Sequence, residues 1–108
     1  MRRHAVVATM VLILGLVVAA SCRPAPRTHT VQIEAMRFSP AALVVERGDT
    51  IAWVNADLVP HTVTSAERAL DSGTIAPGET WRWTASGTAA LPYVCTLHPT
   101  MSGRVDVR

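Results

Sequence analysis

The sequence predicts an all-β domain, built as an antiparallel sandwich or barrel of short strands. Apolar residues recur with a period of two in several segments, and turns rich in Gly and Pro separate these segments. A convincing helical period is missing, although residues 65–71 could form one brief helix. With 108 residues, the chain is long enough for one domain.

Each predicted strand rests on its own pattern of alternation. Ile51, Trp53 and Asn55 share one face of a segment that follows the turn at 47–49. Pro92 lies inside another segment, which requires a bulge or a position at the sheet edge because proline cannot donate a ladder hydrogen bond. The predicted strands cover residues 30–36, 42–46, 50–55, 61–65, 80–84, 89–95 and 103–108.

The N-terminal segment has the layout of a secretory signal. Residues 5–20 are almost entirely apolar, two arginines precede them, and small residues follow. An uncleaved membrane anchor is the weaker alternative, because sixteen helical residues would span about 24 Å, less than the roughly 30 Å of a bilayer core. We therefore expect a signal over residues 1–21, a flexible Pro-rich tether over 22–29 and the folded domain over 30–108.

The stretch "VVAASC" at 17–22 resembles a bacterial lipobox, in which the cysteine is lipidated and becomes the new N-terminus. This resemblance implies a lipid anchor on Cys22. Ordinary cleavage near Ala20 would instead leave Cys22 as a free thiol, a liability in an oxidising compartment. A disulfide between Cys22 and Cys95 is a further alternative, disfavoured by the loose segment that follows Cys22.

Charge excludes one class of partner. Residues 22–108 hold eight arginines and eight acidic residues, so their net charge is about zero with histidine neutral. This balance leaves no basic patch for nucleic acid.

The segment "YVCTLHPTM" places three soft or borderline metal ligands three residues apart, at Cys95, His98 and Met101. Upstream, "WVNADLVPHTV" offers His61 directly after Pro60. Each of these residues alone is more often structural, as a surface histidine, a buried thiol or a core methionine. Loops at one end of a sandwich can bring all four together, which predicts a metal site. His29 falls in the tether and is not expected to contribute.

These two segments resemble the small blue copper proteins, the cupredoxins, and most of all their amicyanin and plastocyanin-like members. The resemblance covers about residues 31–107 and implies a Greek-key β-sandwich holding one type 1 copper. It makes His61, Cys95 and His98 the strong equatorial ligands and Met101 the weak axial ligand. Such a set suits copper in both oxidation states. Zinc is the alternative metal, but structural zinc sites seldom use methionine.

The resemblance also implies roles for the neighbours of the ligands. Asn55 is expected to hydrogen-bond the loop that carries the cysteine, and backbone groups at Thr96 to tune the thiolate. An apolar rim for partner docking is expected around the exposed edge of His98, formed by Pro60, Leu97 and Pro99. Met36 is expected in or near the core, or beside the metal.

The function that this implies is electron transfer between redox partner proteins by an exported monomer, in the bacterial periplasm or at the cell surface. The alternative is a periplasmic protein that scavenges or delivers copper. An enzyme is not expected, because four protein ligands leave no open position for a substrate. The sequence departs from the amicyanin pattern at Leu97, where those proteins have proline, and in two extra residues within "GTAALPYVC".

Overall fold

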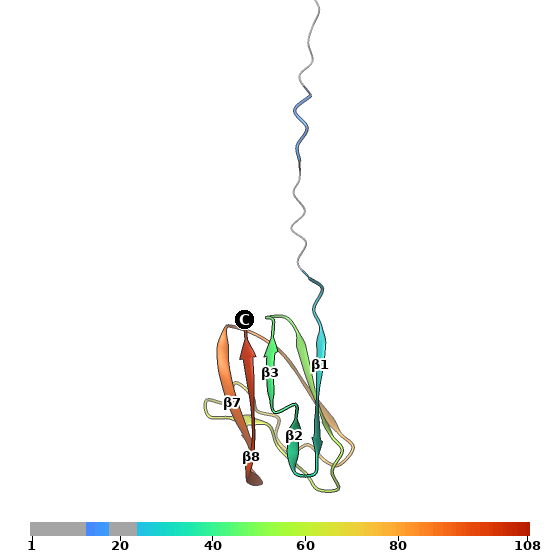
Figure 1. Ribbon diagram of the computed structural model, residues 1–108, viewed down its shortest axis with the longest axis vertical. Helices are drawn as coiled ribbons and strands as arrows, with labels where there is room; N and C mark the ends of the chain where they lie inside the picture. The colour runs from blue at the N-terminus through green and yellow to red at the C-terminus, as the bar shows by residue number, and fades with distance from the viewer. Residues whose placement is uncertain (1–12, 18–23) are drawn as a thin grey trace, which may run out of the picture.

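The computed structural model describes residues 13–17 and 24–108, and its folded part is a sandwich of eight strands (Figure 1). The strands are β1 (Thr28–Glu34), β2 (Arg37–Ser39), β3 (Ala42–Val45), β4 (Thr50–Asn55), β5 (Thr64–Ser65), β6 (Thr80–Thr84), β7 (Ala89–Cys95) and β8 (His98–Val107).

The predicted brief helix at 65–71 is wrong. Ser65 ends β5, and a turn follows in which Arg68 has a φ of 57°. Backbone and side-chain groups of Ser65 and Leu70 hydrogen-bond each other across this turn, which competes with a helical ladder. Among the described residues, no helix is long and apolar enough to cross a membrane.

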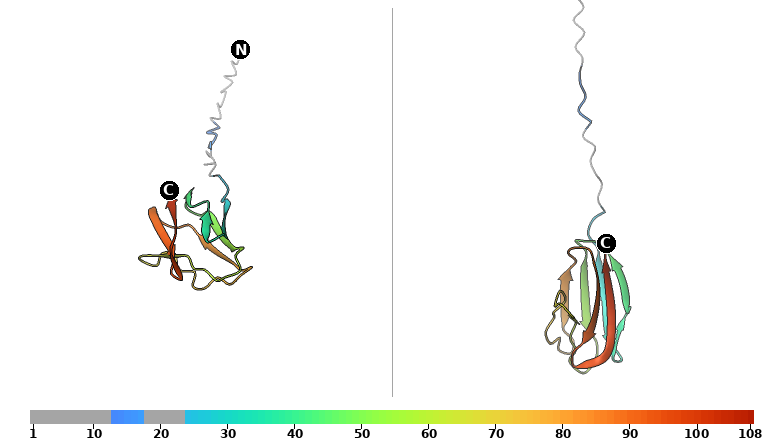
Figure 2. Two further views of the ribbon diagram at one scale, coloured as in Figure 1. Left: turned by 60° about the horizontal axis from the view of Figure 1, so that its bottom comes forward. Right: turned by 90° about the vertical axis from the view of Figure 1, so that its left-hand side faces the viewer.

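Two four-stranded sheets face each other, in the orders β2-β1-β4-β6 and β3-β8-β7-β5 (Figure 2, right). The predicted all-β sandwich is therefore confirmed. Its pairing is not uniformly antiparallel, because β1 pairs with β4 and β3 pairs with β8 in parallel. The chain leaves the first sheet after β2, adds β3 to the second sheet and returns as β4. A crossover of this kind can bring two strands side by side in the same direction.

Several strand boundaries differ from the prediction. β1 begins at Thr28, so two residues of the expected tether belong to the sheet, and β8 begins at His98 instead of residue 103. The three-residue β2 was missed because so short a strand carries little alternation. The expected strand at 61–65 reduces to β5 and an isolated bridge between His61 and Ile75. Of the expected signal, residues 1–12 and 18–21 lie outside the described residues, and so does Cys22.

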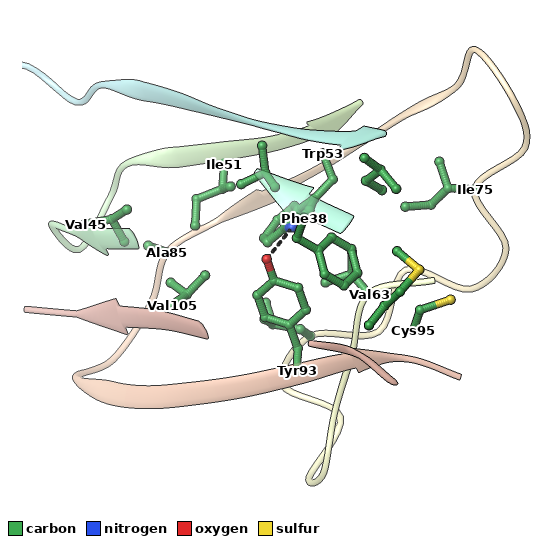
Figure 3. Packing of buried hydrophobic residues seen from close by; sticks show 14 of the residues in the cluster. Phe38, Val45, Ile51, Trp53, Val63, Ile75, Ala85, Tyr93, Cys95 and Val105 are labelled. Atoms are coloured by element: carbon green, nitrogen blue, oxygen red, sulfur yellow. Dashed lines mark hydrogen bonds between the residues drawn. The ribbon is translucent and has the colours of Figure 1, made fainter. Parts of the chain in front are cut away.

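The core fills the space between the sheets (Figure 3). Ile51, Trp53 and Asn55 are fully buried, as their shared face predicts. The Tyr93 ring reaches from β7 to the opposite sheet, where its hydroxyl oxygen accepts a hydrogen bond from Trp53 Nε1 at 3.2 Å. Burial raises the pKa of Tyr93, and the Trp53 hydrogen bond opposes that rise. Gly103 lies opposite Tyr93, and a Cβ atom there would collide with the ring.

Pro92 occupies a position of the kind that the sequence requires. β5 pairs with β7 only at Tyr93 and Val94, so Pro92 has a strand partner on its β8 side alone. The register also shifts between Val94 and Cys95, immediately before the ligand turn. Pro92 therefore removes no ladder hydrogen bond to β5.

Candidate metal centre

The turn between β7 and β8 carries two of the expected ligands. Cys95 ends β7, His98 begins β8, and the two residues pair across the turn. This turn lies at the end of the sandwich opposite the C-terminus and the start of β1 (Figure 1). We call it the ligand pole, and the opposite end, where β1 begins and β8 ends, the terminal pole.

Three donor atoms converge at the ligand pole. Cys95 Sγ lies 3.7 Å from Nδ1 of His61 and 3.7 Å from Nδ1 of His98. The three atoms all lie within 4.8 Å of one another. With bond lengths like those of zinc to histidine and cysteine, one shared ion would separate sulfur and nitrogen by about 3.6–3.8 Å. The two sulfur–nitrogen distances therefore fit one metal ion shared by the thiol and both imidazoles.

Asp57 orients the His61 ring. Nε2 of the fully buried His61 donates a hydrogen bond to Asp57 Oδ2 at 2.7 Å. Because the ring proton then resides on Nε2, the lone pair of Nδ1 is free to bind a metal. Backbone N–H groups of Ala35 and Met36 donate to the same carboxylate, at 2.8 and 3.1 Å. Desolvation raises the pKa of Asp57, but these hydrogen bonds, Met36 first, together with His61 lower it overall.

Sequence analysis did not single out Asp57. The available signal was an acidic residue four positions before a histidine ligand, because a carboxylate commonly accepts the second N–H of a ligating ring. An acid at that spacing in a loop is common, so the pattern alone is weak.

Thr62, and not the expected Thr96, hydrogen-bonds the sulfur of Cys95. The backbone N–H of Thr62 donates to Cys95 Sγ at 3.3 Å. The backbone N–H of Thr96 donates instead to Thr62 Oγ1, at 2.9 Å, so Thr96 joins the two ligand loops. Thr62 Oγ1 also lies 3.0 Å from Thr96 Oγ1. A hydrogen bond to a thiolate stabilises its charge, which is a known means of tuning copper–sulfur sites.

Asn55 holds a different loop from the one expected. Its side-chain amide donates to the carbonyl oxygens of Val59 and Ile75, each at 2.9 Å, and its Oδ1 accepts from the backbone of Asp57 at 3.0 Å. As the last residue of β4, Asn55 lies at the base of the loop that leads to His61. It therefore fixes the His61 loop, and the predicted bond to the cysteine loop is wrong.

Exposure differs sharply among the expected site residues. Met101 is 4% exposed and belongs to the same buried cluster as Cys95, whereas His98 is half-buried. The loops that carry the histidines expose apolar side chains, which form the apolar rim: Leu58, Val59, Pro60, Leu97 and Pro99. Met36 is 41% exposed, so of the places expected for it the interior of the core is wrong.

Comparison of the sequence with known families and proteins points to copper-binding proteins in each case. The family described as "Copper binding proteins, plastocyanin/azurin family" matches residues 26–108. Amicyanin-alpha of Methylorubrum extorquens is 28% identical over 105 residues, which cover 93% of this chain and 87% of that protein. Amicyanin of Paracoccus denitrificans is 30% identical over 93 residues, 82% of this chain and 71% of the relative.

Solved structures agree with the sequences. The crystal structure of amicyanin from Paracoccus versutus matches with a TM-score of 0.70 at 28% identity, covering 75% of this chain and 81% of that one. The chemistry points the same way, since two imidazoles, a buried thiol and a nearby thioether are ligands that copper prefers. The chain therefore belongs to the plastocyanin/azurin family of copper-binding proteins.

Proposed function

We infer that this protein carries single electrons between redox partners through one type 1 copper ion. The observation that carries this function is the convergence of His61, Cys95 and His98 on a point that fits one ion. With a thioether as fourth ligand, no coordination position stays open for a substrate, so the protein is a carrier and not an enzyme.

Within this site, His61, Cys95 and His98 would hold the copper ion strongly, and the Met101 thioether would be a weak fourth ligand. Copper supplies the one-electron couple, and the protein supplies a fixed geometry. The Asp57 hydrogen bond prevents rotation of the His61 ring, and Thr62 N–H stabilises charge on the sulfur. Because packed strands and loops hold the donors in place, a change of oxidation state moves few atoms. Electron transfer is correspondingly fast.

The electronic spectrum of the copper-loaded protein tests this function. Oxidised protein should be intensely blue, because a thiolate donates charge to Cu(II), and Cys95→Ser should abolish the colour. Cys22→Ser is the matched control, since it makes the same change at the other cysteine and should leave the colour intact. A protein that binds copper yet stays colourless after oxidation contradicts the type 1 assignment.

The apolar rim is the surface on which redox partners dock. Its members flank His61 and the half-buried His98 in the sequence, and they include Leu58, which is 95% exposed, and Leu97, which is 50% exposed. Apolar surface around an exposed ligand edge lets two proteins approach closely without desolvating charges, and such a contact is transient.

Electron self-exchange between two copies of the protein tests the rim. Leu97→Arg places like charges opposite each other when two rims meet, so the rate should fall by about tenfold or more. Val44→Arg is the matched control, because Val44 is also 50% exposed but lies on β3 beside the N-terminal segment. Equal rates for both variants would contradict docking through the rim.

We further propose that the protein is exported and held to a membrane by lipid on Cys22. The lipobox-like "VVAASC" supports this anchor. The chain also enters the fold at the terminal pole (Figure 1), so an anchored domain can turn its apolar rim away from the lipid. Mass spectrometry of the mature N-terminus decides the matter. A lipid mass on Cys22 supports the anchor, and an unmodified chain that begins at Ser21 contradicts it.

A further inference from the structure

A series of aromatic side chains crosses the sandwich from β7, the strand that ends at Cys95, to β6, the edge strand of the opposite sheet. Tyr93 lies two residues before Cys95 on β7, and both side chains point into the core (Figure 3). The Tyr93 and Trp53 rings are 5.8 Å apart and nearly perpendicular, at 88°. Trp81 follows, with its ring 5.2 Å from that of Trp53 and tilted by 36°. The three rings are therefore in continuous contact.

The outer end of this series reaches the protein surface. Trp81 lies on β6, the edge strand of its sheet, and pairs directly with Trp53 across the ladder. Trp53 is fully buried and Tyr93 is 2% exposed, but Trp81 is only half-buried. A molecule in solution can therefore contact the first ring of the series and none of the others.

We propose that Trp81, Trp53 and Tyr93 form a second electron route, which connects the copper site with the face at β6 and is separate from the edge of His98. This inference rests on the proposed function. Indole and phenol rings are, with sulfur, the protein groups most easily oxidised by one electron. The reagent that this route admits is a strong one-electron oxidant that attacks the β6 face.

The electrons balance without a net proton transfer. The oxidant takes one electron from Trp81 and is itself reduced by one electron, which leaves an indole radical cation. Trp81 then regains an electron through Trp53 and Tyr93 from the reduced copper site, which ends one electron more oxidised. Because Trp53 donates its N–H to Tyr93 within the core, both groups stay hydrogen-bonded while the electron passes. The route therefore repairs Trp81 and spares the protein a lasting radical.

The same strand supplies a matched comparison for Trp81. Trp83 is also half-buried and packs against the same core cluster, but in the ladder it lies opposite the aliphatic Ile51. Within the described part of the chain, its ring contacts no other aromatic ring. Trp83 is thus half-buried like Trp81 but lies off the route.

A photosensitiser placed beside Trp81 tests the proposal. The sequence contains no lysine, so Thr80→Lys creates one reactive side-chain amine on β6 for an amine-directed ruthenium polypyridyl label. The unsubstituted chain, labelled at its N-terminal amine alone, gives the background. After flash-quench oxidation of the label, transient absorption follows the tryptophan radical and the blue band together. In reduced, copper-loaded protein, the radical should decay as the blue band appears.

Two variants decide the outcome. Trp81→Phe keeps an aromatic ring but resists oxidation, so the fast phase of the blue band should be lost, whereas Trp83→Phe should keep it. In copper-free protein the Trp81 radical should form and persist, a readout that needs no metal. An unchanged fast phase in Trp81→Phe, or its equal loss in Trp83→Phe, overturns the route. The blue colour of the oxidised sample, recorded before it is reduced for the flash experiment, shows separately that each variant holds its type 1 site.

Discussion

Each pole of the sandwich contains a hydrogen-bonded histidine–aspartate pair, but the two pairs serve different purposes. At the ligand pole, His61 donates to Asp57 at 2.7 Å, and at the terminal pole His29 donates to Asp49 at 2.9 Å. The His61 side chain is fully buried and its other ring nitrogen faces Cys95, whereas the His29 side chain is 24% exposed. Whether a histidine–aspartate pair can bind a metal therefore depends on what the second ring nitrogen faces, which for His61 is the sulfur of Cys95.

The terminal pair fastens the start of the fold. The Asp49 carboxylate also accepts backbone hydrogen bonds from Arg27, at 2.9 Å, and from Glu46, at 3.1 Å. The Arg27 N–H first, and then the His29 ring, lower the pKa of Asp49 to about 2. His29 thus belongs to β1, so its expected place in the tether is wrong. Asp49 joins the incoming chain to the turn before β4.

The largest expected effect is a difference in copper affinity between variants at the two poles. Asp57→Ala should weaken copper binding by about 10–100-fold, because loss of a hydrogen-bond partner behind a ligating histidine typically costs that much. Competition with a chelator of known affinity measures it. Asp49→Ala should bind copper as the unchanged protein does. Asp57→Asn, which keeps an acceptor without the charge, should fall between the two, and equal affinities for both alanine variants would erase the distinction between the poles.

A smaller effect concerns the stability of the copper-free fold. Asp49→Ala removes the acceptor for three donors at the entry of β1, so the free energy of unfolding should fall. Urea denaturation followed by tryptophan fluorescence measures this loss. His29→Gln, which keeps a donor at a similar reach, should lose less. If Asp49→Ala unfolds at the same urea concentration as the parent, the carboxylate does not fasten β1.

The smallest effect is a dependence of stability on acid. The pKa of Asp49 is about 2 in the folded protein, below the ordinary value of 3.8. A lowered pKa stabilises the fold above the ordinary value, so this contribution is present above about pH 4 and is lost as the pH falls toward 2. Unfolding curves across that range should show a smaller decline for Asp49→Ala than for the parent. A parallel decline would assign the acid sensitivity to other groups.

Much of the fold was predictable because alternation reports burial directly. The segment with Ile51, Trp53 and Asn55 forms β4, and Pro92 lies where β7 has a strand partner on one side alone, as proline requires. Parallel pairing was not predictable, since it depends on which sheet each strand joins, and alternation says nothing about that choice. The strand status of His29 was hidden for a related reason: its pairing partner in the parallel ladder is Ile51, 22 positions away.

At the metal centre, the metal-binding side chains could be predicted from the sequence, but the groups that hydrogen-bond them could not. His61, Cys95 and His98 come together as their chemistry and spacing imply. Asp57 and Thr62 act through one carboxylate oxygen and one backbone N–H, and their positions follow from how the loops fold. Residue type alone does not reveal such contacts.

Because Tyr93 lies so close to Gly103, substitutions at these two positions depend on each other. A Cβ atom at position 103 would collide with the Tyr93 ring, which is itself buried and hydrogen-bonded to Trp53. A side chain at 103 is therefore tolerated only together with a smaller residue at 93, which would also remove the acceptor for Trp53. Libraries that diversify the strand after the ligand turn should vary positions 93 and 103 jointly, and relatives with a larger residue at one should carry a smaller residue at the other.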